Sequence, residues 1–299
     1  MIPIIREGKG VSIHLNDQTN PAMKRILVPC DFSDTAVQAF KFAVDIATQS
    51  QGEIILLSVI ELPVMHDTVL MPTLSFEEAY MKDMRANAEK NFDKMRTKWA
   101  KEGLRISSFV EYGPVNTVIS RFVETKKCDL IVMGTKGSSG FKEFIIGSNT
   151  EKIVRWSPVP VIAVKRTVRA GSIKNIIFPN TLQEDQEKLV LKVKELQSLF
   201  KATLHIVYIN TPSKFRKDVD TKLQLKSFAR RFMLKDYTLS VYNDLDQETG
   251  LAHFIKETKG DLVAMATHGR RGLAHLMTGS IAEDVVNHID CPIWTCKVS

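Results

Sequence analysis

The sequence predicts an α/β protein made of two tandem, open, parallel sheets of five strands each, with helices on both faces. Three observations predict it. Short apolar runs alternate with amphipathic helical stretches, as in βαβ units. The second half of the chain repeats the strand motifs of the first half. A chain of 299 residues is also long enough for two domains, each with its own core.

The elements of the first half follow one another from Met23 onward. Ser33 offers an N-cap for the first helix, whose apolar positions recur at helical spacing. The predicted strands are 26–28, 54–60, 106–110, 130–133 and 159–164, and the later helices are 76–102, 115–125 and 148–155. Parallel strands joined by helices require right-handed crossovers, which place helices on both faces of the sheet.

The second half repeats these elements with one deletion. Pro179 corresponds to Pro29, and residues 261–269 match 129–137 position for position. The offset is 150 at the first strand and 132 at the later motif, so about eighteen residues are missing between the second and third strands of the second copy. We therefore predict one domain at 23–167, a second at 172–299, and a leading extension at 1–22, expected to be a flexible tail or the product of an upstream start codon.

The composition of the chain limits the class of protein and the kinds of partner to be expected. The apolar content of 44% and the charged content of 25% are those of a soluble globular protein. No apolar run is long enough to span a bilayer, and the N-terminus has no secretory signal, so we expect a cytoplasmic protein without a membrane partner. The net charge of +7 could attract nucleic acid or anionic lipid. No lysine-rich block or RNA-reading motif concentrates that charge, so we favour a solvated basic surface and do not expect nucleic acid to bind.

Four cysteines lie at or beside strand-like segments, where buried free thiols are expected: Cys30, Cys128, Cys291 and Cys296. No pair has the spacing of a structural zinc site.

Residues 129–150 carry the candidate binding site. An apolar strand stops at Gly134, a loop with Gly137 follows, and Gly147-Ser148 then opens a helix. Glycines let the backbone approach a ligand closely, and a helix N-terminus adds unpaired amides and a positive dipole end. The segment therefore predicts an anion site suited to nucleotide phosphates. It is neither a Walker loop nor the usual dinucleotide motif, since neither glycine frame is present.

The spacing of these glycines resembles the G-x2-G-x9-G-[ST] signature of ATP-binding universal stress proteins, and the chain after Met23 resembles a tandem pair of such domains. The resemblance implies a Rossmann-like fold, similar to that of the adenine-nucleotide alpha hydrolases, and ATP with Mg or Mn as the ligand. Single-domain members dimerise through their last strands. The resemblance therefore implies an intramolecular pseudo-dimer in which 159–164 faces 291–297, which would also cover two exposed edge strands.

The resemblance also implies the ligand contacts. Pro29, Cys30 and Asp31 would lie by the adenine and ribose, and Val59 would close the base pocket. Met133 and Gly134 would pass near the ribose. The phosphate contacts would come from Gly137, Gly147, Ser148 and Asn149, with Thr150 as a further donor. Several of these residues also have a purely structural interpretation: Asp31 as a turn residue, Cys30 as packing, which we favour, and Gly147-Ser148 as a plain turn and N-cap.

The second copy departs from this pattern at three positions. The replacements are Thr181 for Asp31, Ala266 for Gly134 and Tyr208 for Val59. Because they remove a carboxylate, add a methyl group and add a bulky ring, we predict one ATP site per chain. His268 and His275 in the second glycine loop suggest a metal, but no further ligand lies at a suitable spacing, and we expect solvated side chains.

The pattern of apolar and basic residues in 214–232 predicts an amphipathic helix. Its apolar residues are Phe215, Val219, Leu223 and Phe232, beside a row of basic residues. It could bind an acidic partner, but we favour an amphipathic helix with a solvated basic face.

The leading hypothesis is a regulatory nucleotide-binding protein of the stress response, not an enzyme. The alternatives are a slow ATPase or adenylyl-transfer enzyme on the same fold, and an interaction module without a ligand. The H-x-G-H and S-G-G-x-D-S motifs of related adenylating folds are absent, and no cluster of catalytic side chains accompanies Gly134. We predict no catalytic residue and no protein-held metal, and a homodimer and an unknown protein partner stay open.

Overall fold

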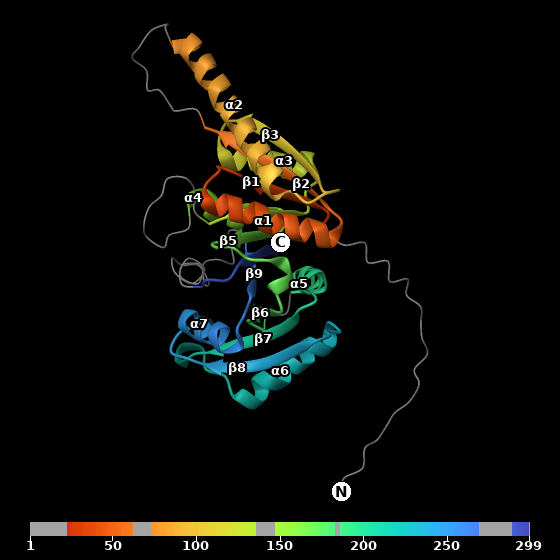
Figure 1. The fold of residues 1–299 in the computed structure, drawn as a ribbon. Helices are drawn as coiled ribbons and strands as arrows, with labels where there is room; N and C mark the ends of the chain where they lie inside the picture. Colours follow the sequence, from red (N-terminus) through yellow and green to blue (C-terminus); the bar gives the residue numbers. More distant parts are fainter. Residues whose placement is uncertain (1–22, 62–72, 136–146, 183–185, 269–288, 299) are drawn as a thin grey trace.

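The computed structural model describes residues 23–61, 73–135, 147–182, 186–268 and 289–298. In this part of the chain, ten strands form one sheet in the order β3-β2-β1-β4-β5-β10-β9-β6-β7-β8 (Figure 1). The first half contributes β1 (Arg25–Pro29), α1 (Asp34–Ser50), β2 (Glu53–Ile60), α2 (Thr73–Trp99), β3 (Arg105–Tyr112), α3 (Val115–Thr125), β4 (Leu130–Gly134), α4 (Ser148–Trp156) and β5 (Val161–Val164). The second half contributes η1 (Ala170–Ser172), β6 (Asn175–Pro179), α5 (Glu187–Phe200), β7 (Thr203–Asn210), η2 (Pro212–Lys214), α6 (Asp218–Arg231), β8 (Tyr237–Asn243), α7 (Gln247–Thr258), β9 (Leu262–His268) and β10 (Ile293–Val298).

The α/β class and the parallel order of strands within each half are as predicted. The two five-stranded sheets expected from the sequence are joined into one sheet, because β5 and β10 pair antiparallel, with Ile293 opposite Ala163 and Thr295 opposite Val161. This pairing is the facing of 159–164 and 291–297 that the resemblance implied. The last strand of each half therefore covers the edge of the other, which leaves β3 and β8 as the two edges of the sheet.

The registers confirm the internal repeat. Ile26 lies opposite Ile54 in β1 and β2, and Ile176 lies opposite Leu204 in β6 and β7, which keeps the offset of 150. On the other side of β1, Ile26 lies opposite Leu130, while Ile176 lies opposite Leu262. The shortened connection is the predicted one, since α2 has 27 residues and its counterpart α6 has 14.

Several element boundaries differ from the predicted ones. The long helix begins at Thr73 and ends at Trp99, before the left-handed residue Gly103, whose φ is 78°. The third strand runs from Arg105 to Tyr112, because it pairs with the whole of β2. The predicted helix 214–232 begins only at Asp218, after a 3-10 turn.

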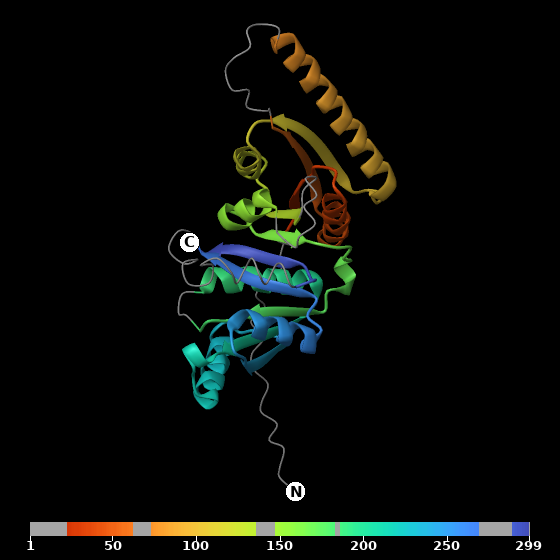
Figure 2. The ribbon, with the colours of Figure 1, turned by 90° about the vertical axis from the view of Figure 1, so that its left-hand side faces the viewer.

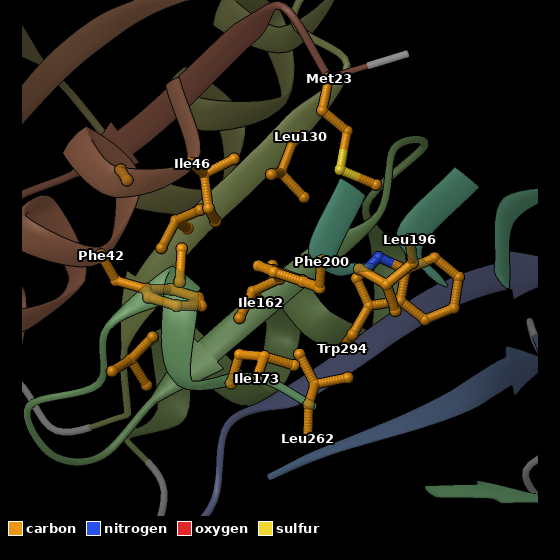
Figure 3. Close-up of a cluster of buried hydrophobic side chains, with 14 of the residues drawn as sticks. Met23, Phe42, Ile46, Leu130, Ile162, Ile173, Leu196, Phe200, Leu262 and Trp294 are labelled. Atoms are coloured by element: carbon orange, nitrogen blue, oxygen red, sulfur yellow. The ribbon is translucent and has the colours of Figure 1, made fainter. Parts of the chain in front are cut away.

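The two halves share a core on one face of the sheet. In the first half, α1 and α2 lie on the side of the sheet opposite α3 and α4 (Figure 2). The buried side chains of α1, α2, α5 and α6 form one continuous cluster. At its centre, Phe42 of α1 stacks on Phe200 of α5 with ring centroids 6.1 Å apart, and Trp294 of β10 is fully buried beside them (Figure 3). On the other face, α3 and α4 cover the first half and α7 covers the second, over two separate clusters. None of the helices in the described ranges has the length and apolar content needed to cross a membrane.

Candidate functional site

In the first half, the strand order is β3-β2-β1-β4-β5. The chain adds β2 and β3 on one side of β1 and then β4 and β5 on the other side, so the switch point of the sheet lies between β1 and β4. In open α/β sheets a ligand binds outside the carboxyl ends of the strands at this switch point. Leu27 of β1 lies opposite Ile131 of the parallel strand β4, so the carboxyl ends of the two strands, at Pro29 and Gly134, lie side by side. The structure thus brings together the predicted residues that follow β1 and those that end β4.

The turn between β1 and α1 is fixed by its own hydrogen bonds. Asp31 Oδ1 accepts from the amide of Ser33 at 3.1 Å and from its hydroxyl at 2.6 Å, and Ser33 Oγ in turn accepts from the amide of Ala36. Phe32 between them has a φ of 64°. Asp31 is exposed, and the bonds support the alternative interpretation of this residue as a turn former.

Cys30 contributes packing. Its thiol is buried in the shared core, 3.8 Å from the sulfur of Met95, and this burial raises its pKa to about 12. The amide of Cys30 donates to the carbonyl oxygen of Leu57 at 2.8 Å. The side chain therefore lies on the α1 and α2 face, within the shared core.

Gly134 is required for a reason that the sequence did not reveal. A Cβ atom added there would lie 2.7 Å from the carbonyl carbon and the hydroxyl oxygen of Thr35 and 2.9 Å from the amide nitrogen of Ala36. Real Cβ atoms do not come this close to backbone atoms, so a side chain would push the first turn of α1 away from β4. Gly134 therefore lets the start of α1 approach the end of β4.

The start of α4 is attached to the end of β4 by two hydrogen bonds. The amide of Gly147 donates to the carbonyl oxygen of Thr135 at 2.8 Å, and the hydroxyl of Thr150 donates to the carbonyl oxygen of Gly134 at 2.9 Å. Both donors were expected to face phosphate, and both are used within the protein instead. The N-cap Gly147 has no side chain to accept from the first turn, so Ser148, Asn149 and Thr150 present their amides at the helix start.

The other predicted contacts lie on the α3 and α4 face or outside the described residues. Val59 is half-buried and packs on the cluster under α3, and Met133 is buried in the same cluster. Gly137 of the glycine motif lies outside the described residues, and so does His275 of the second copy.

In the second half, the comparison of Tyr208 with Val59 is wrong. The register aligns Tyr208 with Ser58 and Ile209 with Val59. Because neighbouring residues of a strand face opposite sides of the sheet, Tyr208 belongs to the shared core and cannot fill a pocket lined by Ile209. Its hydroxyl donates to the carbonyl oxygen of Lys214 at 3.3 Å.

Thr181 does occupy the position of Asp31, but Asn180 makes the turn bonds. Asn180 Oδ1 accepts from the amide of Leu182 at 2.7 Å, and its side chain is buried against Gln186, with amide contacts of 3.1 and 3.3 Å. Leu182 has a φ of 60°, like Phe32 in the first copy. An asparagine directly after a strand is the signal that could have identified this turn.

Within the ranges that the structure describes, no group of three or more histidine, cysteine or acidic side chains could hold a metal ion.

The comparisons with known proteins agree with this geometry. The model of the universal stress protein family matches residues 23–165 and 243–297. The chain belongs to this family. Among its relatives, universal stress protein MJ0531 of Methanocaldococcus jannaschii is 31% identical over 144 residues, which cover 48% of this chain and 82% of the relative. Universal stress protein MJ0577 of the same organism is 28% identical, over 48% of this chain and 95% of the relative.

A solved structure extends the comparison to both halves. The crystal structure of a universal stress protein from Archaeoglobus fulgidus superposes with a TM-score of 0.71 and covers 91% of this chain and 96% of its own. At 19% identity, this likeness shows the fold alone. The second family match covers α7, β9 and β10, so a universal stress protein pattern is present in both halves.

Proposed function

We propose that this universal stress protein binds one adenine nucleotide per chain, ATP with a divalent ion, at the carboxyl ends of β1 and β4, and acts as a regulatory protein of the stress response. The observation that carries the proposal is the attachment of α4 to β4. Two hydrogen bonds, from Gly147 to Thr135 and from Thr150 to Gly134, hold the first turn of α4 at the switch point of the sheet.

The chemistry of this end of the sheet suits a polyphosphate. The first-turn amides of Ser148, Asn149 and Thr150 are donors without an intrahelical acceptor, and the dipole of α4 adds positive potential at the same place. The exposed hydroxyl of Ser148 is a further donor. The base and ribose would lie toward Pro29, Asp31 and Val59. A magnesium or manganese ion would be coordinated mainly by phosphate oxygens and water.

A single site per chain follows from two differences in the second half. Thr181 supplies no carboxylate where Asp31 stands, and Ala266 carries a methyl group where Gly134 has none. The predicted effect of Tyr208 no longer supports the argument, since that side chain lies on the other face. A titration that returns two equal ATP sites per chain would contradict the proposal.

The sharpest test removes one amide from the start of α4 and leaves the helix intact. Ser148 is the first residue of α4, a position where proline is well accommodated, and the preceding Gly147 has a ψ of 139°, which proline also requires. We expect Ser148→Pro to weaken ATP binding about tenfold or more, because a charge-assisted hydrogen bond is lost. Binding is measured by calorimetric titration in the presence of Mg²⁺.

Ser148→Ala is the matched control, since it removes the hydroxyl and keeps the amide, and we expect a smaller loss of affinity. Equal affinity of Ser148→Pro and the unchanged protein would overturn the placement of the phosphates at α4. Mass analysis of ligand released from purified protein identifies the nucleotide among ATP, AMP and cyclic nucleotides. A steady-state assay for released phosphate tests for ATPase activity, which we do not expect.

A further inference from the structure

Helix α6 has a second apolar face that the described residues of the fold leave exposed. The side chains turned to the core are Thr221, Leu225, Phe228 and Ala229. Three apolar residues of the predicted helical segment point outward: Phe215, just before the helix, is 71% exposed, Val219 is 70% exposed and Leu223 is 57% exposed. The amphipathic helix predicted for 214–232 therefore leaves these three apolar side chains outside the core.

Basic side chains lie on the same outward face. Val219, Leu223, Lys226 and Arg230 follow one another at steps of four, three and four residues, which places them in one row along a helix. Lys222 flanks the row, and its nearest carboxylate oxygen, on Asp218, is 3.9 Å away. Residues 214–231 hold seven basic and two acidic side chains, a net charge of +5 in a chain whose total is +7.

The position of α6 leaves this face accessible in the described structure. The helix lies at the outer end of the second half, beside the edge strand β8 (Figure 1). Its inner side packs on the sheet, so only the outward part of its circumference can contact a partner. Exposed apolar side chains beside lysine and arginine side chains on one helix face are the combination that lets a helix lie in the plane of an anionic lipid surface.

We propose that α6 docks this protein onto anionic membrane surfaces. Val219, Leu223 and Phe215 enter the boundary between headgroups and acyl chains, while Lys222, Lys226 and Arg230 lie against the lipid phosphates. The helix lies in the plane of the surface and does not cross it. This proposal revises the expectation that no membrane is a partner, and it is independent of the nucleotide site.

The test is co-sedimentation of the full chain with vesicles at about 0.1 M salt. The vesicles are pure phosphatidylcholine, or phosphatidylcholine with about one third phosphatidylserine, an anionic lipid of the kind that attracts basic segments. We expect binding to the anionic vesicles only. Lys222→Gln/Lys226→Gln/Arg230→Gln should weaken it about fivefold for each charge removed. Val219→Ser/Leu223→Ser should weaken it about tenfold or more through lost apolar insertion.

Exposed lysines of α2 provide the matched control. Lys82→Gln/Lys90→Gln/Lys94→Gln removes the same charge from the first half and should leave most of the binding intact. Equal losses in the two triple variants, or full binding by Val219→Ser/Leu223→Ser, would overturn the proposal. Failure of the unchanged protein to bind would also overturn it, and would leave an acidic protein as the partner for this face. Circular dichroism checks that every variant is folded.

Discussion

The hydroxyl of Thr150 donates a 2.9 Å hydrogen bond to the carbonyl oxygen of Gly134. The two residues are sixteen positions apart, and the bond joins the first turn of α4 to the last residue of β4. Gly134 in turn touches the first turn of α1. The candidate site is therefore built on three connected pieces of backbone, and a change at any of them should affect the others.

Thr150→Val removes the donor of this bond and keeps the shape of the side chain. Because the hydroxyl is buried and its loss leaves the Gly134 carbonyl one donor short, we expect the free energy of unfolding to fall by about 1–2 kcal/mol. ATP affinity should fall as well, since α4 is held less firmly. Urea unfolding measures the stability. Thr150→Ser retains the donor and should restore most of it, and a loss equal to that of the valine variant would argue against the bond.

Gly134→Ala should destabilise the protein by about 1–3 kcal/mol, because the added methyl group meets the backbone of α1 and overpacking has costs of this size. Gly171→Ala is the control, since no atom of the described residues lies within 4 Å of a Cβ built there. Its unfolding free energy should change by less than about 0.5 kcal/mol. Equal stabilities of the two variants in urea would show that α1 and β4 do not meet as described.

Asp246 caps α7 and should make stability depend on pH. Its carboxylate accepts from the amides of Thr249 and Glu248, and these bonds, led by that of Thr249, lower its pKa in the folded protein. Because the pKa is lowered on folding, the Asp246 carboxylate contributes to the free energy of unfolding at pH values above its pKa in the unfolded chain, near 4. That contribution is lost as the pH falls through the pKa of the folded protein. Asp246→Ala should reduce stability by about 1 kcal/mol at pH 7, and the difference should shrink below about pH 4.

Asp246→Asn is the matched control for this prediction, because an asparagine caps a helix without a charge. Its stability relative to the alanine variant should not depend on pH in the acid range. A constant difference between the unchanged protein and Asp246→Ala from pH 7 to pH 3 would contradict the assignment.

The four cysteines should be unreactive in the folded protein. Burial raises the pKa of Cys30 and Cys291 to about 12 and that of Cys128 and Cys296 to about 11, so almost no thiolate is present at pH 8. Mass spectrometry after treatment with iodoacetamide should find native protein unmodified and urea-unfolded protein alkylated four times. Rapid modification of a native thiol would show that its segment opens.

Phe200→Ala should weaken both halves together. The ring stacks on Phe42 across the shared core, and loss of a buried phenylalanine costs about 3–5 kcal/mol. Hydrogen exchange should accelerate in both β1 and β6, because one cluster supports both strands. Acceleration confined to β6 would mean that the halves unfold independently.

Much of the fold was predictable from the sequence because its strands are short, apolar and repeated. The match of 129–137 with 261–269 placed β4 and β9, and registers with the same offsets agree. The side of the sheet to which each side chain points was harder to predict. An error of one position in aligning β2 with β7 moved Tyr208 to the wrong side of the sheet, since side chains alternate along a strand.

The outward face of α6 escaped prediction for a related reason. Leu225 and Phe228 on one side, and Val219 and Leu223 on the other, both follow helical spacing, so periodicity alone cannot decide which row is buried. The bonds of Thr150 and Gly147 were not predictable either, because the motif shows which residues meet but not whether their donors are used within the protein.

The antiparallel junction of β5 with β10 has a consequence for how such a protein diversifies. In a symmetric dimer of identical subunits, every replacement appears twice, so neither copy can change alone. Here the two strands at the junction have different sequences, and so do the halves behind them. One half can therefore keep the glycine that lets the start of α1 approach the end of β4, while the other half has an alanine at that position and exposes basic and apolar side chains on α6.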